Sequence, residues 1–276
     1  MIVDSHQHFW SLDAPWFSWP TPDLAGIYRD YGPADLEALI RPAGVDRTVL
    51  VQVAPRTDET AHFLALAART DFVAGVVGWV DLEDPACAAD LERFADDPKF
   101  RGIRPMLQSI PDVEWMLRPA LHAHLTLAQR LGLRFDALIK PPHLTALATF
   151  LDRYPDLPVV VDHGAKPEIV RGQAGFDDWA PAIAAVARRP QVFCKLSGLL
   201  TEAGNRTALQ DLRPFVDHLI EIFGAERLMW GSDWPVVELV APYPDWLSQA
   251  RDLVGRLSEA EQNRILGETA CRFYGL

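Results

Sequence analysis

The sequence has few of the features that would indicate secretion or nucleic-acid binding. It has three cysteines, Cys87, Cys194 and Cys271, which are widely spaced and form no CxxC pair. A scattered, odd number of cysteines is typical of reduced thiols, so no disulfide framework is expected. The formal net charge of −12 leaves no basic excess for nucleic acid or an anionic membrane surface. We therefore expect neither as a partner.

Long hydrophobic runs are missing as well. No apolar stretch approaches the roughly 20 residues that a membrane-spanning helix needs. The first residues, MIVDSHQHFW, lack the basic and apolar regions of a signal peptide. The sequence thus predicts a cytoplasmic protein. It also has no GxGxxG or GxxxxGK[ST] motif after a strand, which weakens the case for an open nucleotide-binding sheet.

The chain does contain a regular alternation of short apolar runs and amphipathic segments. The predicted strands lie within 1–10, 47–54, 72–81, 100–107, 134–140, 157–164, 192–198 and 227–233. The predicted helices are 33–40, 57–69, 84–95, 115–131, 142–152, 176–188, 208–223 and 243–266. Apolar strands that alternate with helices form a parallel sheet covered by helices. Eight such units predict an α/β fold, a single-domain (β/α)8 barrel of the TIM type over 1–276.

Between the first strand and first helix, residues 11–33 form a long loop rich in Trp and Pro. Trp16 and Trp19 lie within it. Loops of this length without regular structure are usually functional or disordered. Its aromatic content argues against disorder.

The first strand carries an HxH motif, His6 and His8, preceded by Asp4. Residues two apart in a strand point to the same side, so these three side chains should share one face. Paired imidazoles at a strand end suit a metal ion or an oxygen that gains negative charge. The alternative is one buried polar histidine and one exposed histidine.

The ends of later strands carry matching groups. They are Arg104, His163, Lys195 with Ser197, and Asp233. Barrel enzymes form their active sites at the carboxyl ends of the strands, so these groups should converge on His6 and His8. Each also has a structural alternative: a loop histidine at 163, a turn cap at Asp233, a lysine that reaches solvent at 195, and an ion pair for Arg104. The other five histidines should be structural or exposed: His62, His122, His124, His143 and His218.

Four segments resemble the amidohydrolase superfamily: DSHQHFW, VVVDHGAKP, CKLSGL and RLMWGSDWPV. More narrowly, the chain is similar along its whole length to the sugar-lactone hydrolase branch, with L-fuconolactonase-like and L-rhamnonolactonase-like enzymes. The resemblance implies a (β/α)8 barrel. By the same resemblance, binuclear members carry a bridging lysine or glutamate on a middle strand. The fourth predicted strand of this chain ends in Arg104-Pro105 and offers neither. Lys140 lies on the next strand. We therefore expect no two-metal centre.

The predicted reaction is hydrolysis of a sugar lactone to the aldonic acid. Asp233 would activate water, and His6, His8 and His163 would polarise the carbonyl directly or through one metal. Those four residues would also be the ligands of a weakly bound zinc-like ion, if the enzyme uses one. Substrate contacts are predicted for one set of residues: Arg104, Lys195, Trp10, Trp79, Trp234 and Gln52.

Further aromatic and amide side chains, Trp115 and Gln108, could add to a surface for a polyhydroxylated ring. Core packing is the alternative for the tryptophans. The alternative functions are a pyrone-dicarboxylate lactonase, a metal-dependent decarboxylase, or a barrel that only binds sugar. The predicted partner is a small sugar lactone, and oligomer formation stays open.

Overall fold

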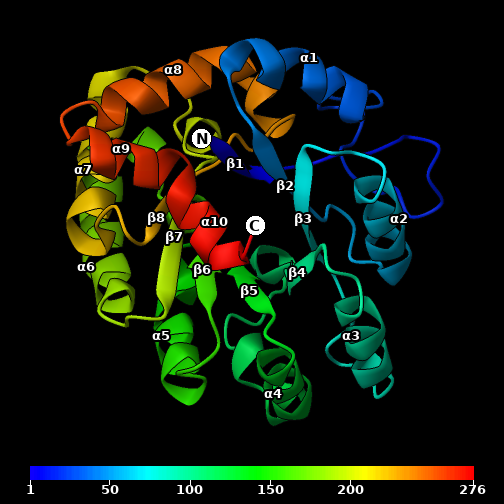
Figure 1. Ribbon diagram of the computed structural model, residues 1–276. Coiled ribbons are helices and arrows are strands. Elements are labelled where there is room, and N and C mark those ends of the chain that lie inside the picture. The colour runs from blue at the N-terminus through cyan, green and yellow to red at the C-terminus, as the bar shows by residue number, and fades with distance from the viewer.

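The protein is a barrel of eight parallel strands that follow one another in chain order (Figure 1). The computed structural model describes residues 1–276. The first and last strands meet at the residues that follow them: the His8 N–H donates to the Trp234 carbonyl at 2.7 Å. The predicted (β/α)8 fold is confirmed. Its carboxyl-end rule places the ends of all eight strands at one mouth.

The strands are short and interior. They are β1 Val3–Gln7, β2 Arg47–Val51, β3 Val73–Gly78, β4 Phe100–Ile103, β5 Arg134–Ala137, β6 Val159–Val161, β7 Val192–Leu196 and β8 Leu228–Trp230. The helices surround them: α1 Pro33–Ala43, α2 Thr57–Ala67, α3 Cys87–Ala95, α4 His122–Arg130, α5 Leu144–Arg153, α6 Gln173–Ala187, α7 Leu209–Phe223 and α8 Tyr243–Val254. Two further short helices follow, α9 Glu259–Asn263 and α10 Thr269–Tyr274.

Most helix boundaries differ from the sequence prediction by a few residues, and three differences have a clear local form. The segment from Trp115 forms two 3-10 turns before α4 begins at His122. The helix expected from Asp84 begins at Cys87, because the Asp84 carboxylate closes a turn by accepting the Ala86 N–H at 2.8 Å. The pattern predicted over 243–266 is two helices, since a new one starts after Ser258, whose side chain caps α9.

The bottom of the barrel is closed by the C-terminal helix. Phe273 and Tyr274 of α10 pack in a buried cluster with the interior valines Val49, Val77 and Val160. In Figure 1 this red helix crosses the barrel near its axis. The interior therefore opens to solvent at the opposite mouth, where the strands end. No helix combines the length and the apolar character that spanning a bilayer requires.

The long loop of residues 11–33 is ordered by its two ends. Trp10 and Tyr31 exchange both backbone hydrogen bonds, at 3.1 and 2.9 Å. Their rings also pack edge to face, with centroids 5.3 Å apart. This closure directs Ser18 and Trp19 toward the barrel mouth, where both line a cavity.

Candidate active site

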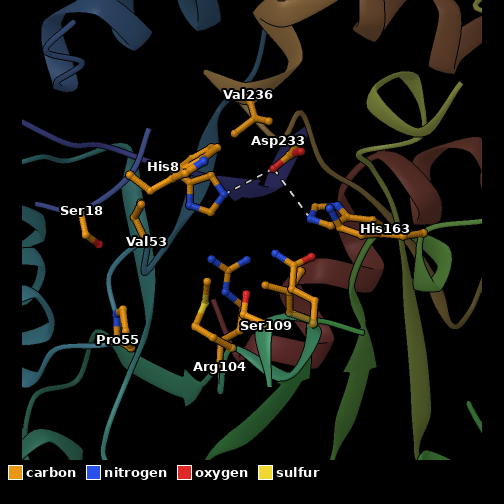
Figure 2. Close-up of a pocket in the computed structure, with 14 residues that line it drawn as sticks. His8, Ser18, Val53, Pro55, Arg104, Ser109, His163, Asp233 and Val236 are labelled. Carbon is orange, nitrogen blue, oxygen red and sulfur yellow. Dashed lines mark ion pairs between the residues drawn. The ribbon is translucent and has the colours of Figure 1, made fainter. Parts of the chain in front are cut away.

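A cavity of about 360 Å³ opens at the carboxyl ends of the strands. Its volume lies in the usual range for a small-molecule site. Figure 2 shows its wall, where Asp233 lies between His8 and His163, with Arg104 opposite. The lining residues are His8, Ser18, Trp19, Val53, Pro55, Arg104, Met106, Gln108, Ser109, Leu138, His163, Lys166, Asp233 and Val236.

The carboxylate of Asp233 is the centre of this group. Its Oδ1 lies 3.4 Å from His8 Nε2, 3.7 Å from His6 Nε2 and 3.8 Å from His163 Nε2. The turn after β8 does not use this side chain as a cap, since the Trp234 N–H donates to Ser232 Oγ at 2.9 Å. The Asp233 carboxylate is thus free to act on what the cavity binds.

Both Asp233 and His163 have left-handed backbone conformations, with φ of 57° and 54°. Such conformations are uncommon outside glycine and concentrate at functional sites. The His163 ring is held by Ser197 Oγ, 2.8 Å from Nδ1. It also rests on Gly198, where an added Cβ would lie 2.5 Å from the same nitrogen. A glycine is needed there because the imidazole occupies the space of a side chain.

His6 and His8 come from the first strand, but they occupy different depths. His8 lines the cavity and its Nδ1 lies 2.8 Å from the Val51 carbonyl, so Nδ1 carries the hydrogen and Nε2 accepts. His6 is fully buried behind it, with Nε2 3.1 Å from His8 Nε2. Asp4 does not share their face. Its carboxylate instead accepts from the Ser232 N–H at 2.8 Å and from the Tyr243 hydroxyl at 3.2 Å, and the strand register shifts between Asp4 and Gln7.

Burial sets the charges of this group. It lowers the pKa of His6, of His8 and of His163, the last to about 4. Burial alone would raise the pKa of Asp233, but the surrounding imidazoles, His163 first, hold it below its usual value. At neutral pH the site therefore presents an ionised carboxylate among neutral imidazoles.

A layer of buried charge lies beneath the cavity floor. The ammonium of Lys195 lies 2.6 Å from Asp136 Oδ2 and 3.0 Å from Asp162 Oδ1. Tyr274 of α10 donates its hydroxyl to Asp136 at 2.7 Å. Arg104 reaches the same layer with Nη1 3.6 Å from Asp162 Oδ2. Two carboxylates thus balance two cations in the barrel interior.

Several residues predicted to touch substrate lie away from the cavity wall. Lys195 is fully buried in that charged layer and does not reach solvent. Gln52 donates to the Arg104 carbonyl at 2.8 Å and supports that residue instead. Trp10, Trp79 and Trp234 also lie outside the lining, and Trp10 and Trp234 pack in the core. Of the predicted substrate contacts, Arg104 lines the cavity, as do Gln108 and Trp19.

Other residues of the site went unrecognised in the sequence. Asp162 directly precedes His163, and Asp136 is a buried acidic residue between Phe135 and Ala137 in β5, which was the available signal. Lys166 lines the cavity and pairs with Glu202 at 3.2 Å. The buried Glu59 carboxylate accepts the backbone N–H groups of Val53 and Ala54, which shape the rim. None of these roles follows from a local motif.

The five remaining histidines lie off the cavity wall, as predicted. Four of them hydrogen-bond to other parts of the chain: His122 to Tyr154, His124 to the Leu82 carbonyl, His143 to the Leu107 carbonyl and His218 to the Ala180 carbonyl. His62 packs beside Trp16, with ring centroids 5.2 Å apart.

The central cluster fits a divalent metal in kind and spacing. His6, His8 and Asp233 each offer one donor atom, and these atoms lie within 4.8 Å of one another. The donors of a tetrahedral zinc site are roughly 3.3 Å apart, as follows from its bond lengths. The 3.1 and 3.4 Å separations here are close to that value. Lys140, the candidate bridging group for a second metal, is exposed at the surface.

The barrel and this histidine–aspartate cluster define a protein of the amidohydrolase class, and the amidohydrolase family model matches residues 3–276. The chain belongs to that family. It is 46% identical over 276 residues to an L-fucono-1,5-lactonase of Burkholderia ambifaria, covering 99% of this chain and 94% of the relative. An L-fucono-1,5-lactonase of Burkholderia multivorans is 37% identical, covering 99% and 96%. A crystal structure of an amidohydrolase from Burkholderia multivorans with bound zinc superposes with a TM-score of 0.94, at 34% identity, covering 100% and 99%.

Proposed function

We propose that this protein hydrolyses a sugar lactone, an aldonolactone of a deoxy-hexose or hexose, to the aldonic acid. The observation that carries the proposal is the geometry of the cavity wall, where Asp233 Oδ1 lies 3.4 Å from His8 Nε2 and 3.8 Å from His163 Nε2, with Arg104 opposite. The full-length similarity to two L-fucono-1,5-lactonases supports the choice of substrate class. A lactone is an activated ester, so a base and an oxyanion partner suffice.

Asp233 accepts a proton from water as the water oxygen attacks the lactone carbonyl carbon. The oxygen of the resulting tetrahedral species carries the negative charge, and the Arg104 guanidinium is the cation on the wall that faces it. His163, whose Nδ1 lies 2.8 Å from Ser197 Oγ, adds a second donor from Nε2 in the tautomer in which the Ser197 hydroxyl donates to Nδ1. When the ring C–O bond breaks, the proton on Asp233 passes to the leaving ring oxygen, which becomes a hydroxyl group. His6 lies behind the cavity wall and helps to orient His8 through the contact between their Nε2 atoms.

Where a divalent metal is bound, His6, His8, His163 and Asp233 would hold it. It would polarise the carbonyl and acidify bound water. We propose that at most one such ion binds, weakly, and that hydrolysis does not require it. The reason is charge: Arg104 Nη1 lies 3.3 Å from His6 Nε2 and opposes a cation there.

A pyrone-dicarboxylate lactonase is the second candidate. Two carboxylates on a substrate call for several cations on the wall, and the cavity offers Arg104 and Lys166, of which Lys166 already pairs with Glu202. This favours a neutral sugar lactone. A decarboxylase would need a firmly held metal beside an aromatic acid, which the cation at Arg104 disfavours.

The test is a pH-indicator assay of the purified protein on a panel of aldonolactones, with a pyrone dicarboxylate and an aromatic acid in parallel. Spontaneous lactone opening is subtracted with a protein-free control. We expect fast acid release from at least one aldonolactone. Faster turnover of the dicarboxylate, or binding of lactones without any turnover, would contradict the proposal.

A further inference from the structure

The Lys195 ammonium hydrogen-bonds to Asp136 and to an active-site histidine, His6, and forms an ion pair with Asp162. An ammonium offers three N–H donors and no acceptor. Its neighbours are Asp136 Oδ2 at 2.6 Å, Asp162 Oδ1 at 3.0 Å and His6 Nδ1 at 3.0 Å. Because an ammonium has no lone pair, it can only donate to His6 Nδ1.

This contact determines where the His6 ring carries its hydrogen. A neutral imidazole has one N–H and one acceptor nitrogen. Because Nδ1 accepts from Lys195, the hydrogen is on Nε2. The neighbouring ring agrees independently: His8 donates from Nδ1 to the Val51 carbonyl, so its Nε2 accepts, and His6 Nε2, 3.1 Å away, is the donor.

We propose that Lys195 is a positioning residue that holds His6 as the Nε2–H tautomer and thereby weakens metal binding at the cluster. A metal ion needs the Nε2 lone pair of His6, and the Lys195 contact places a hydrogen there instead. To bind a metal, His6 must move its hydrogen to Nδ1, toward an ammonium. The inference concerns the same site as the proposed lactonase function, and its test uses no lactone.

The contact from Arg104 does not reverse this assignment. Its Nη1 lies 3.3 Å from His6 Nε2, farther than the Lys195 ammonium lies from Nδ1 at 3.0 Å and than His8 Nε2 lies from Nε2 at 3.1 Å. It also has a carboxylate alternative, Asp162 Oδ2 at 3.6 Å. Without Lys195, by contrast, a Nδ1–H of His6 would face Asp162 Oδ1 at 3.4 Å. A carboxylate behind a histidine is the arrangement that favours metal ligation by its other nitrogen.

The direct test is the tautomer itself. Nitrogen-15 NMR of the wild-type protein with labelled histidine, freed of metal by a chelator, separates Nε2–H from Nδ1–H rings. The His6 signals are identified by their loss in His6→Gln. We expect His6 as Nε2–H. A His6 ring with its hydrogen on Nδ1 would overturn the proposal without any change to Lys195, so the result does not depend on a variant at Lys195 that folds.

The second test is zinc affinity, measured by competition with a chromophoric chelator. Lys195→Met should bind zinc more tightly and shift His6 to Nδ1–H. Arg104→Met is the matched charge control, since it removes one cation near the same ring but leaves the Nδ1 contact intact. Lys99→Met controls for loss of a partly buried lysine, whose ammonium donates to backbone carbonyls of Ala67 and Val73.

We expect zinc affinity of Lys195→Met to exceed that of Arg104→Met by about tenfold or more, the typical effect of one charge-assisted hydrogen bond that ligation must break. Lys99→Met should match the wild type. Equal affinities for Lys195→Met and Arg104→Met would show that charge alone acts, and would contradict the tautomer assignment.

Discussion

Replacing Gly198 by alanine should damage catalysis by displacing the His163 ring. The new Cβ would lie 2.5 Å from His163 Nδ1 and 2.6 Å from Cγ, whereas ordinary contacts begin near 3.4 Å. The ring must therefore retreat by roughly 0.9 Å, which is the difference between the first and last of these values. A misplacement of about 1 Å at a reacting centre can cost on the order of 10²-fold in rate. We expect kcat for lactone hydrolysis to fall by about that factor.

The chain offers a control at Gly44, which ends α1 in the left-handed conformation with φ of 71°. An added Cβ there would meet nothing within 4 Å. Both alanine variants carry the cost of a positive φ, about 1–2 kcal/mol of the free energy of unfolding. Only Gly198→Ala also displaces an imidazole. Steady-state kinetics and thermal melts of the two variants separate these effects. A folded Gly198→Ala protein with the kcat of Gly44→Ala would refute the reasoning.

Three more predictions concern pH, the cavity rim and metal. In the folded protein the pKa of His163 is lowered to about 4, whereas in the unfolded chain it is near 6.5, so its contribution to stability is full above pH 6.5 and is lost as the pH falls. In denaturant titrations, the unfolding free energy of the wild type relative to His163→Gln should therefore drop by about 3 kcal/mol between pH 7 and 4. A pH-independent difference would count against this. Glu59→Ala leaves the buried N–H groups of Val53 and Ala54 unpaired, so the free energy of unfolding should fall by about 1–3 kcal/mol and KM should rise. An unchanged KM would mean that the cavity rim does not depend on this carboxylate. Prolonged treatment with a chelator should leave kcat nearly unchanged, and loss of activity that zinc restores would contradict the metal-independent mechanism.

Part of the site could be predicted because barrel topology converts sequence position into spatial position. His8 and Arg104 directly follow a strand, His163 and Asp233 lie two and three residues after one, and the carboxyl ends of all strands meet at one mouth. A count of strands was therefore enough to bring together residues separated by as many as 225 positions.

The depth of individual side chains could not be predicted in the same way. Lys195 is the second-last residue of β7, and its burial is explained by the ion pairs with Asp136 of β5 and with Asp162, which directly follows β6. Likewise, Trp234 lies beside the catalytic candidate in sequence, yet its ring packs on Tyr31 of the long loop and on Phe9, which lies just after β1. Such placements depend on contacts between distant segments, which no local pattern encodes.

The helix boundaries show the same limit. Amphipathic spacing around Trp115 is continuous with α4, but Pro119 interrupts it and two 3-10 turns form instead. The predicted elements were correct in type and order, and the irregular turns lie mostly between strand and helix. These are the segments that build the cavity, where local propensity carries the least information.

The account depends most directly on Asp233 as the base that activates water. Asp233→Asn retains the shape and suits the left-handed backbone at this position, but lacks the basic oxygen. Its kcat on the best aldonolactone of the panel should fall on the order of 10²–10⁴-fold while KM changes little. Its melting temperature should stay close to that of the wild type, because Ser232 rather than Asp233 caps the turn. A near-normal kcat in a folded Asp233→Asn protein would contradict the mechanism.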